Sequence, residues 1–294
     1  MIRVAPLAAL VGVTAIWGVT FVQVQDAIAL YPLFAFLAVR FAISALALAP
    51  FAWRAVLALP RAGLVAGLGV GLLLAGAYGF QTAGLDRTTV ASTGFITGLY
   101  VVFTPLLALR LFGTRVPGVA WVGVVLAVVG LLLLNGVPGG SALGNVLVLV
   151  NAVLQSFQIA AMERFAPRYD QRALTFLQMS ASSVAFAILA VALGQVEVPH
   201  GSTVWGALLV TGIFAGALGY LIATWVQART TAARAALAFT LEAPFAALFG
   251  VLLADEVLGW VGWAGCAVML AGIVLAEPAA ADVLRRVVGR RTSS

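Results

Sequence analysis

The 294-residue sequence contains no lysine, one cysteine and one histidine, and charged residues make up only 9% of it. The single cysteine, Cys266, excludes a framework of intramolecular disulfides. The single histidine, His200, leaves no cysteine–histidine cluster that could hold a metal ion. No Gly-x4-Gly-Lys-Ser/Thr phosphate loop is present, which excludes a nucleotide-driven pump for this chain. We therefore predict no cofactor and no metal.

Hydrophobic residues, in contrast, supply 63% of the chain. A soluble domain of this length would need far more polar surface to cover its core. The apolar residues also come in long runs, such as 62–83, 89–109 and 203–226. Each run is near the roughly 20 residues with which an α-helix crosses the hydrocarbon core of a bilayer. The sequence predicts an all-α polytopic membrane protein with lipid around its helices.

Arginine, proline, glycine and aspartate divide the apolar sequence into ten predicted transmembrane helices joined by short loops. These helices cover residues 6–24, 32–51, 62–83, 89–109, 117–134, 143–162, 172–193, 203–226, 232–253 and 258–276. No small-residue cleavage site follows the first helix, so we expect it to be retained rather than removed as a signal peptide.

The net charge of +6 comes from arginine. The arginines lie between the apolar runs rather than along one face, which argues against nucleic acid as a partner. With a cytoplasmic N-terminus, fourteen of the sixteen arginines fall on the cytoplasmic side, while Arg87 lies outside and Arg40 lies within a helix. The positive-inside rule thus predicts a multi-pass protein of a bacterial-type inner (plasma) membrane, with both termini cytoplasmic.

One short stretch occurs twice: Arg-Thr-Thr at 87–89 returns at 229–231, and 229 − 87 = 142 is close to half of the chain. With this offset, residues 78–135 and 220–277 share fifteen identities in 58 pairs, which indicates an internal duplication. We predict a first repeat over residues 1–136, a second repeat over 143–277, and a cytoplasmic arginine-rich tail over 278–294.

Each predicted repeat holds five helices. Because five is odd, the second repeat enters the membrane from the opposite side, and a pseudo-two-fold axis in the membrane plane relates the halves. Many secondary transporters have this inverted-repeat design, in which two similar halves open alternately toward either side of a site at their interface. The alternative is that the duplication built only a stable bundle, a membrane scaffold without transport.

Several motifs, taken in order, match one known family. They are AIWGVTFV (15–22), FAFLAVRFAISAL (34–46), LYVVFTPLLALRLFGTRV (99–116), LEAPFAALFGVLLADEVL (241–258) and a Gly-x6-Gly spacing at Gly123/Gly130 and Gly265/Gly272. The chain resembles the EamA-type branch of the drug/metabolite transporter superfamily, ten-helix proteins made of two five-helix repeats. Over nearly the whole chain it looks most like the bacterial exporters of aromatic and other amino acids.

The resemblance implies export of amino acids, metabolites or drugs. It matches Arg40 to the arginine of the second helix, and Glu256 to the acidic residue that ends the ninth. The first repeat departs from the pattern, because Thr114 stands where glutamate is usual. A shared catalytic use of that carboxylate is therefore doubtful, and a role in capping or orienting a loop fits better.

Polar and aromatic side chains inside the predicted helices are costly in lipid, so we expect them to face the bundle interior or a water-filled cavity. The predicted substrate-binding residues are Trp17, Tyr78, Thr82, Thr97, Tyr100, Asn151, Gln155, Gln158, Tyr220 and Thr224. Aromatic walls with neutral hydrogen-bonding groups suit an amphiphilic zwitterion such as an amino acid. For any one of these residues, the alternative is a plain hydrogen bond to a neighbouring helix.

Glu242 is the only carboxylate well inside a predicted helix. An acid at that depth can bind a substrate ammonium or carry a coupling proton. The alternative is structural: Glu242 caps backbone groups that Pro244 frees, or it pairs with Arg40, whose depth is similar.

Two further features concern helix shape. Pro105 and Pro244 lie in corresponding helices, and broken helices at matching places of two halves point to a binding site and to bending motions. Gly63, Gly67 and Gly71 form a small-residue stripe that allows close approach of a neighbouring helix.

Rival functions have less support. We predict that the chain is not an enzyme, since it has no intramembrane histidine and no paired carboxylates in its core. A channel would need a charged ring or a selectivity loop, and neither is visible. The main alternative is a multidrug or quaternary-cation exporter, but that class relies on a glutamate in the first helix, and residues 6–24 contain no acid. The sequence leaves the oligomeric state open.

Overall fold

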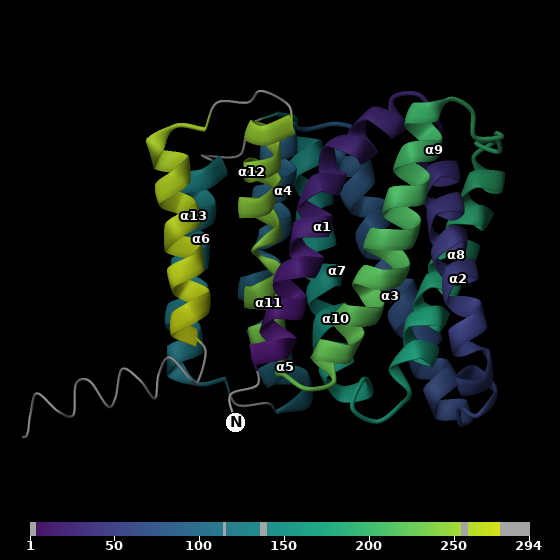
Figure 1. Cartoon of the computed structure of the whole chain (residues 1–294), viewed down its shortest axis with the longest axis horizontal. Coiled ribbons are helices and arrows are strands. Elements are labelled where there is room, and N and C mark those ends of the chain that lie inside the picture. The colour runs from purple at the N-terminus through teal and green to yellow at the C-terminus, as the bar shows by residue number, and fades with distance from the viewer. Residues whose placement is uncertain (1–3, 114–115, 136–139, 254–257, 277–294) are drawn as a thin grey trace, which may run out of the picture.

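The structure, a computed structural model, describes residues 4–113, 116–135, 140–253 and 258–276. Across these ranges the chain is helical, without a strand, and the helices run side by side along one direction (Figure 1). The predictions that concern Thr114, Glu256 and the tail 278–294 fall outside the described residues.

Each predicted segment contains one or more helical elements. In chain order the elements are α1 Val4–Ile28, α2 Leu33–Leu57, α3 Arg61–Leu85, α4 Val90–Gly98, α5 Tyr100–Phe112, α6 Gly118–Asn135, α7 Ala142–Phe165, α8 Gln171–Ala192, α9 Ser202–Leu209, the π-helix η1 Val210–Gly219, α10 Tyr220–Gln227, α11 Ala232–Phe239, α12 Glu242–Leu253 and α13 Trp260–Ala276. The predicted single helices over 89–109, 203–226 and 232–253 are thus each divided.

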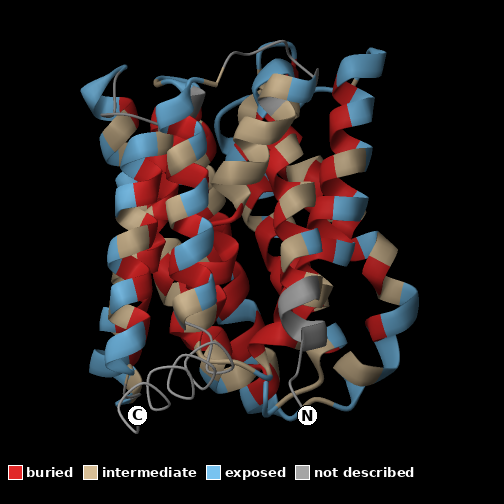
Figure 2. Cartoon of the chain, turned by 60° about the vertical axis from the view of Figure 1, so that its left-hand side comes forward, coloured by how far each residue is buried: buried red, intermediate tan, exposed pale blue. Residues whose placement is uncertain are grey.

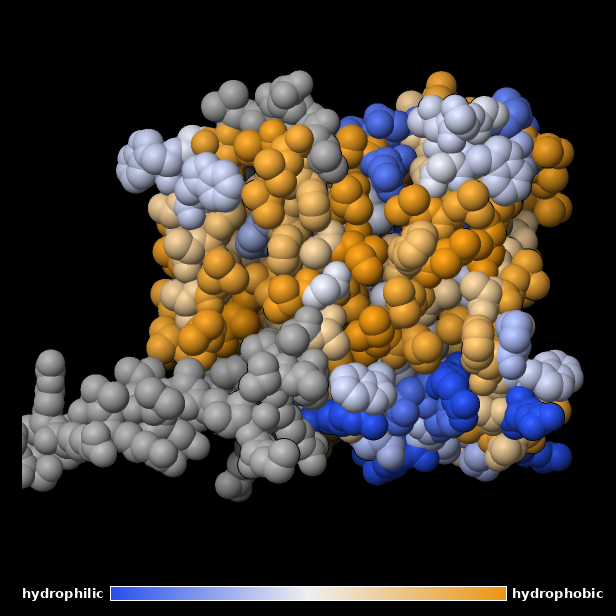
Figure 3. Space-filling model, in the orientation of Figure 1, coloured by the Kyte–Doolittle hydropathy of each residue, from blue (hydrophilic) through white to orange (hydrophobic). Residues whose placement is uncertain are grey.

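Most of the bundle has the dimensions of membrane-spanning structure. Within the described residues, eight segments are long and apolar enough to cross a bilayer, while α6 and α13 are shorter apolar helices. Buried residues gather on the inward faces of the helices (Figure 2). An apolar band crosses the visible face, with hydrophilic residues toward the two ends of the helices (Figure 3). The chain is a multi-pass membrane protein.

A pair of packed helices lies at each side of the bundle. On one side α6 packs on α13 through glycines, and on the other side α2 packs on α8 (Figure 1). A Cβ placed on Gly130 would lie 2.7 Å from the carbonyl oxygen of Gly265, and one placed on Gly272 would lie 2.9 Å from that of Gly123. Gly130 and Gly272 are repeat equivalents (272 − 130 = 142), and so are Gly123 and Gly265 (265 − 123 = 142). The same contact therefore occurs twice in the α6–α13 crossing, with the roles of the two helices exchanged.

The predicted glycine stripe of α3 lies against α8, which confirms its role in close approach. A Cβ on Gly67 would meet the Leu177 side chain at 2.6 Å. A Cβ on Gly71 would meet the Gln178 backbone at 2.9 Å and the Ala181 Cβ at 2.7 Å. All three distances are shorter than a real Cβ tolerates. The backbone of α3 therefore packs against the Leu177 side chain at Gly67 and against the α8 backbone at Gly71.

The Arg-Thr-Thr stretch forms the same turn twice. Arg87 Nη1 donates a hydrogen bond of 2.8 Å to the carbonyl four residues earlier, and Arg229 Nη1 donates one of 2.6 Å to the carbonyl four residues earlier. Thr89 and Thr231 then serve as N-cap residues of α4 and α11, both with φ −80° and ψ 154°. The duplicated sequence therefore folds into a duplicated local structure.

Helix breaks also recur at equivalent places. The break between α4 and α5 falls at Leu99, with φ −64° and ψ −11°. The break between α11 and α12 falls at Thr240 and Leu241, and Thr240 has φ −62° and ψ −13°. Since 241 − 99 = 142, these breaks belong to the repeated architecture.

The prolines do not share that spacing, since 244 − 105 = 139. A proline prevents a hydrogen bond to the carbonyl four residues earlier. For Pro244 that carbonyl belongs to Thr240, at the break, whereas for Pro105 it belongs to Val101, just beyond the break. The prediction that the helices are interrupted in both halves is correct, but the interruptions precede the prolines.

The π-helix η1 accounts for an inequality between the repeats. The segment Ser202–Gln227 has 26 residues, whereas its counterpart α3, Arg61–Leu85, has 25. A π-helix places more residues in each turn than an α-helix, so it takes up the extra residue without lengthening the rod. Equivalent residues at the start of the two segments, Arg61 and Ser202, are accordingly 141 apart. Equivalent residues after the π-helix, such as Tyr78 and Tyr220, are 142 apart.

The α2 and α8 helices make equivalent joints with the other half. Ser44 Oγ donates to the carbonyl of Gly212 in η1 at 2.7 Å, and Ser182 Oγ donates to the carbonyl of Gly71 in α3 at 3.0 Å. Each serine stands eleven residues after the first residue of its helix (44 − 33 = 182 − 171). Repeat-equivalent residues in α1–α2 and α7–α8 are thus 138 apart.

Candidate functional site

Two connected cavities lie in the middle of the bundle, where helices of both repeats meet. The central pocket is lined by Trp17, Tyr78, Gln81, Thr97, Tyr100, Asn151, Gln155, Tyr220, Phe239 and Glu242. The adjoining pocket is lined by Trp17, Thr20, Phe21, Val24, Arg40, Tyr78, Gln81, Thr82, Leu85 and Glu242. Four side chains belong to both pockets: Trp17, Tyr78, Gln81 and Glu242.

Both pockets are narrow. The cavity volume is about 30 Å³ for the central pocket and about 20 Å³ for the adjoining pocket. This is space for no more than a few water molecules. An organic substrate could enter only after the surrounding helices had moved apart.

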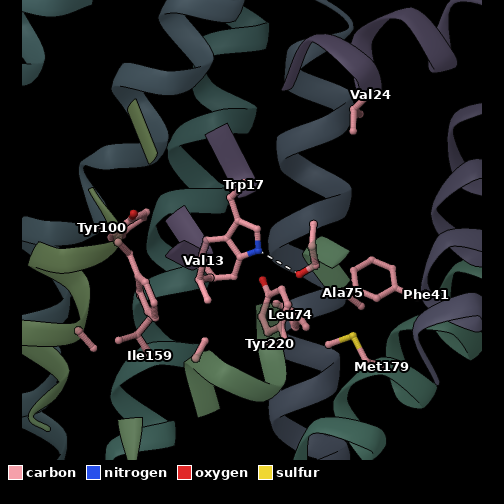
Figure 4. Close-up of a cluster of buried hydrophobic side chains, with 14 of the residues drawn as sticks. Val13, Trp17, Val24, Phe41, Leu74, Ala75, Tyr100, Ile159, Met179 and Tyr220 are labelled. Atoms are coloured by element: carbon pink, nitrogen blue, oxygen red, sulfur yellow. Dashed lines mark hydrogen bonds between the residues drawn. The ribbon is translucent and has the colours of Figure 1, made fainter. Parts of the chain in front are cut away.

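Trp17 lies at the centre of the site and links α1 to the second repeat. Its Nε1–H donates to the carbonyl of Ala215 in η1 at 3.0 Å, the dashed line of Figure 4. Its ring lies 5.2 Å from that of Tyr220 and 5.3 Å from that of Phe239. Gly219 makes this approach possible, because a Cβ there would lie 2.9 Å from Nε1. The indole is therefore both a pocket wall and a contact between the halves.

Two tyrosines meet at the junction of the repeats. The hydroxyl of Tyr220 donates to the hydroxyl of Tyr78 at 3.1 Å, and the two residues are 142 apart. Equivalent atoms of two similar halves can be in contact only at the centre of the interface between those halves. The tyrosine pair therefore marks the midpoint of the site.

The side of the central pocket formed by α3, α4 and α7 carries neutral polar groups. Thr97 Oγ1 accepts hydrogen bonds from Asn151 Nδ2 at 3.0 Å and from Gln81 Nε2 at 3.2 Å. Gln155 and Tyr100 complete this side. Thr97 stands two residues before the break at Leu99. The hydrogen bonds between the Thr97 hydroxyl and these two amides therefore lie at the end of α4.

The two pockets contain one acidic and one basic residue: Glu242 lines both pockets, whereas Arg40 lines only the adjoining pocket. Glu242 is the first residue of α12, where free N–H groups and the helix dipole favour a negative charge. Gly18 lets α1 approach this point, since a Cβ there would lie 3.0 Å from the Glu242 carbonyl oxygen. Arg40 is 3% exposed, and its Cζ lies 4.8 Å from the centre of the Tyr78 ring. The adjoining pocket thus contains a carboxyl group and a guanidinium.

The hypothesis of an Arg40–Glu242 ion pair is wrong. Among the described residues, the ion pairs lie elsewhere, at the ends of the helices, and no Arg40 nitrogen comes within 4.0 Å of a Glu242 oxygen. The guanidinium is instead held over the rings of Tyr78 and Phe41. The carboxyl group and the guanidinium share the adjoining pocket but do not form an ion pair.

Two predicted site residues line neither pocket. Gln158 Nε2 donates to Gln178 Oε1 at 2.9 Å, so this amide joins α7 to α8. Thr224 is 1% exposed and packed inside the bundle, one turn beyond Tyr220. Pro105 and Pro244 lie in α5 and α12 next to the breaks and do not line the pockets themselves. The other predicted residues line one pocket or both.

Six lining residues were not predicted: the apolar Phe21, Val24 and Leu85 of the adjoining pocket, and Gln81, Phe239 and Thr20. Gln81 lies three residues after Tyr78, on the same face of α3, so helical spacing alone would have found it. Phe239 is the repeat equivalent of Thr97 (239 − 97 = 142). Adding the repeat offset to the predicted residues of the first repeat would have found it. Thr20 lies three residues after Trp17 and could have been found in the same way as Gln81. No group of three or more His, Cys, Asp or Glu within the described part of the chain could hold a metal ion.

Comparison with known proteins agrees with this architecture. The sequence profile of the EamA-like transporter family matches residues 5–136 and again residues 142–276. The chain belongs to the EamA-like transporter family. An uncharacterized transporter of Archaeoglobus fulgidus is 32% identical to this EamA-family chain over 263 residues, which are 90% of this chain and 82% of that protein.

A crystal structure of a protein has the same fold. It superposes on the EamA-family chain with a TM-score of 0.76 at 22% sequence identity, covering 94% of this chain and 98% of that one. The site described above therefore lies inside a membrane protein of a transporter family, at the meeting point of its two family repeats.

Proposed function

We propose that this chain is a secondary transporter that exports amino acids and related amphiphilic molecules by alternating access. One observation carries the proposal: the central pocket is built from repeat-equivalent positions of the two halves. The pairs are Tyr78/Tyr220, Thr97/Phe239, Tyr100/Glu242 and Trp17/Gln155. A site at the interface between two similar halves can be opened to either side of the membrane in turn by movements of those halves.

In this proposal all ten segments cross the membrane, with α6 and α13 as the fifth and tenth crossings, and the halves are inverted. The described arginines support an orientation. Arg54 lies in the last turn of α2 and Arg61 begins α3, Arg164 lies in the last turn of α7 and Arg168 in the connection to α8, and Arg229 follows α10. These connections all lie at the end of the bundle where α1 begins and α13 ends (Figure 1). The positive-inside rule makes that end cytoplasmic, in a bacterial-type inner membrane.

The helix breaks supply the bending points for such a cycle. The narrow pockets represent a closed conformation, which must widen to admit a substrate. The breaks at Leu99 and Thr240 stand beside the pocket in both halves, and backbone there lacks the continuous ladder that makes a helix rigid. Outer parts of α4–α5 and α11–α12 can then tilt while Ser44 and Ser182 keep α2 and α8 joined to their partners.

The chemistry of the pocket favours a zwitterion with an apolar part. The Trp17 and Phe239 rings offer an apolar wall. Glu242 offers a carboxylate to an ammonium, and the amides on the facing side offer hydrogen bonds. A doubly negative phosphate ester is disfavoured, because Glu242 lies in both pockets and would repel it. Coupling to protons is compatible with this assignment of Glu242 and is read out by the same experiment.

Flux into proteoliposomes tests the function. Purified protein is reconstituted at several pH values and supplied with labelled phenylalanine, tryptophan, methionine and threonine, and separately with a quaternary ammonium dye. We expect saturable amino-acid flux that is abolished in Tyr78→Ala and retained in Phe51→Ala, a control whose aromatic side chain is 68% exposed on α2. Dye flux without amino-acid flux would identify a cation exporter that uses Glu242. Absence of all flux from correctly folded protein would refute transport and favour the alternative of a membrane scaffold.

A further inference from the structure

The second helix of each repeat holds a different residue at one equivalent buried position. Arg40 stands seven residues after the first residue of α2, and Gln178 stands seven residues after the first residue of α8 (40 − 33 = 178 − 171). The equivalence of these helices is fixed by Ser44 and Ser182, one turn further along, which bond to equivalent backbone carbonyls. The pair can therefore be compared directly.

Gln178 is fully used within the protein. Its Oε1 accepts a hydrogen bond from Gln158 at 2.9 Å, and its Nε2 donates to the carbonyl of Leu174 at 3.3 Å. The side chain is buried, with 0% exposed. At this position in the second repeat, a neutral amide joins α7 to α8 and lines neither pocket.

Arg40 is not used in this way. It is 3% exposed, and its buried Nε has no hydrogen-bond partner. No carboxylate pairs with it, and the aromatic faces of Tyr78 and Phe41 are its cationic contacts. Cation–π contacts compensate only part of the cost of burying a charge. Since glutamine satisfies the same place in the other repeat, the fold itself does not require an arginine here.

We propose that the Arg40 guanidinium is the anion subsite of the pocket and binds the carboxylate of the transported molecule. The proposal rests on the function proposed above and names the group that recognises its substrate. A planar guanidinium matches a carboxylate with two parallel hydrogen bonds. Nε, which lacks a partner, is one of the donors that such a fork uses.

The position of Glu242 strengthens this assignment. It lines the adjoining pocket together with Arg40 and yet does not pair with it. A guanidinium and an acidic group that do not pair within one pocket are complementary to a molecule that carries a carboxylate and an ammonium on the same carbon atom. The carboxylate of an α-amino acid would then lie at Arg40 and its ammonium toward Glu242, with Trp17 beside the side chain. The repeat equivalents of the two charged residues, Gln178 and Tyr100, are neutral, which fixes one orientation.

A series of ligands tests the assignment on the unmodified protein. Binding of tritiated phenylalanine to the full chain in detergent is competed by phenylalanine, by phenylalaninamide, which lacks the negative charge, and by phenylpropionate, which lacks the positive one. We expect phenylalanine to compete at roughly 10- to 100-fold lower concentration than phenylalaninamide, the usual effect of losing a hydrogen-bonded charge. Equal competition by the two would overturn the proposal.

Substitution of the arginine then assigns the preference to a residue. Arg40→Gln installs the residue of the equivalent position, and Arg54→Gln, an exposed change in the same helix, is the control. We expect Arg40→Gln to weaken phenylalanine binding by the same roughly 10- to 100-fold and to leave phenylalaninamide binding unchanged. Equal weakening of both ligands would make Arg40 a structural residue and refute the assignment.

Two additions keep the outcomes separate. If Arg40→Gln does not fold, Arg40→Lys keeps the charge without the fork, and its preference for phenylalanine must shrink but persist; an unchanged preference counts against the fork. Flux into proteoliposomes distinguishes the two proposals. A wild-type protein that moves phenylalanine and phenylalaninamide equally well refutes only the role of Arg40, whereas one that neither binds nor moves phenylalanine refutes the proposed function as well.

Discussion

The contact between α3 and α8 allows a sharp test of the packing, because two glycines of one helix face different surroundings. Gly71 touches α8, where a Cβ would lie 2.7 Å from the Ala181 Cβ and 2.9 Å from two backbone atoms of Gln178. Gly69, two residues earlier, faces outward, and a Cβ there would meet nothing within 4 Å. Alanine at the two positions therefore makes the same covalent change in opposite environments.

The expected free energies differ in sign. In both variants alanine improves helix propensity by up to about 1 kcal/mol. For Gly69→Ala nothing opposes this gain, so we expect a stability increase of roughly 0.5–1 kcal/mol. For Gly71→Ala the methyl group meets backbone that cannot turn away, and overpacking of this kind costs about 1–3 kcal/mol. We expect a gap of roughly 1–3 kcal/mol between the two variants.

Thermal unfolding in detergent measures the gap. Helical circular dichroism follows the whole bundle, and a thiol-reactive dye follows Cys266, the only cysteine, which is buried in α13 at the far end from α8. If the two probes give coincident transitions, the bundle unfolds as a unit. A Gly71→Ala midpoint equal to or above that of Gly69→Ala would show that α3 and α8 are not in backbone contact.

Two further predictions concern hydrogen bonds. Replacing Tyr78, Tyr220 or both with phenylalanine should lower the unfolding free energy by non-additive amounts. A double-mutant cycle should give a coupling of roughly 0.5–1.5 kcal/mol for the shared hydroxyl bond. Additive losses would show that the two hydroxyls are not hydrogen-bonded. Asp170→Ala should cost about 0.5–2 kcal/mol at pH 7, because Asp170 caps α8 by accepting from the backbone N–H groups of Arg172 and Ala173. Its hydrogen bond with the Arg172 side chain lowers the pKa of Asp170, so this stability is present above the unfolded-state pKa and is lost as pH falls through the folded-state value. The midpoint difference between variant and wild type should thus shrink below about pH 4, and a difference that stays constant from pH 7 to pH 3 would refute this account.

The number and order of the helical segments could be predicted, since each is a long apolar run closed by arginine, proline or aspartate. The interior of the segments could not. A π-helix over 210–219 has no signal in hydrophobic periodicity, because the whole segment is apolar. Its one signal is arithmetic: Ser202 and Arg61 begin equivalent helices 141 apart, whereas Tyr220 and Tyr78 are 142 apart. The breaks were placed at the prolines because a proline marks a weak point, but the backbone bends up to six residues earlier.

Membership of the site could be predicted for side chains that are costly in lipid, such as Trp17, Tyr78 and Gln155, because such groups must find a polar environment. The same rule does not say which environment. Gln158 is as polar as Gln155 and lies three residues away, yet it is satisfied by Gln178 on the next helix. Distance from the junction of the repeats decides between the two, and only the three-dimensional arrangement contains that distance.

The two repeats differ in what they preserve. Backbone features recur in both: the turn after Arg87 and Arg229, the breaks at Leu99 and Leu241, and the serine joints of α2 and α8. Within the lining of the central pocket, an identical side chain recurs only at the tyrosine pair, where equivalent atoms touch. Away from that midpoint the equivalent pairs differ: Trp17/Gln155, Thr97/Phe239, Tyr100/Glu242 and Arg40/Gln178. The alternating access that we propose requires halves that bend alike, whereas the zwitterionic substrate that we propose requires unlike groups around it. A duplicated backbone with a diverged lining meets both requirements at once, which is why loss of charge at Arg40 should change selectivity while leaving the bending points intact.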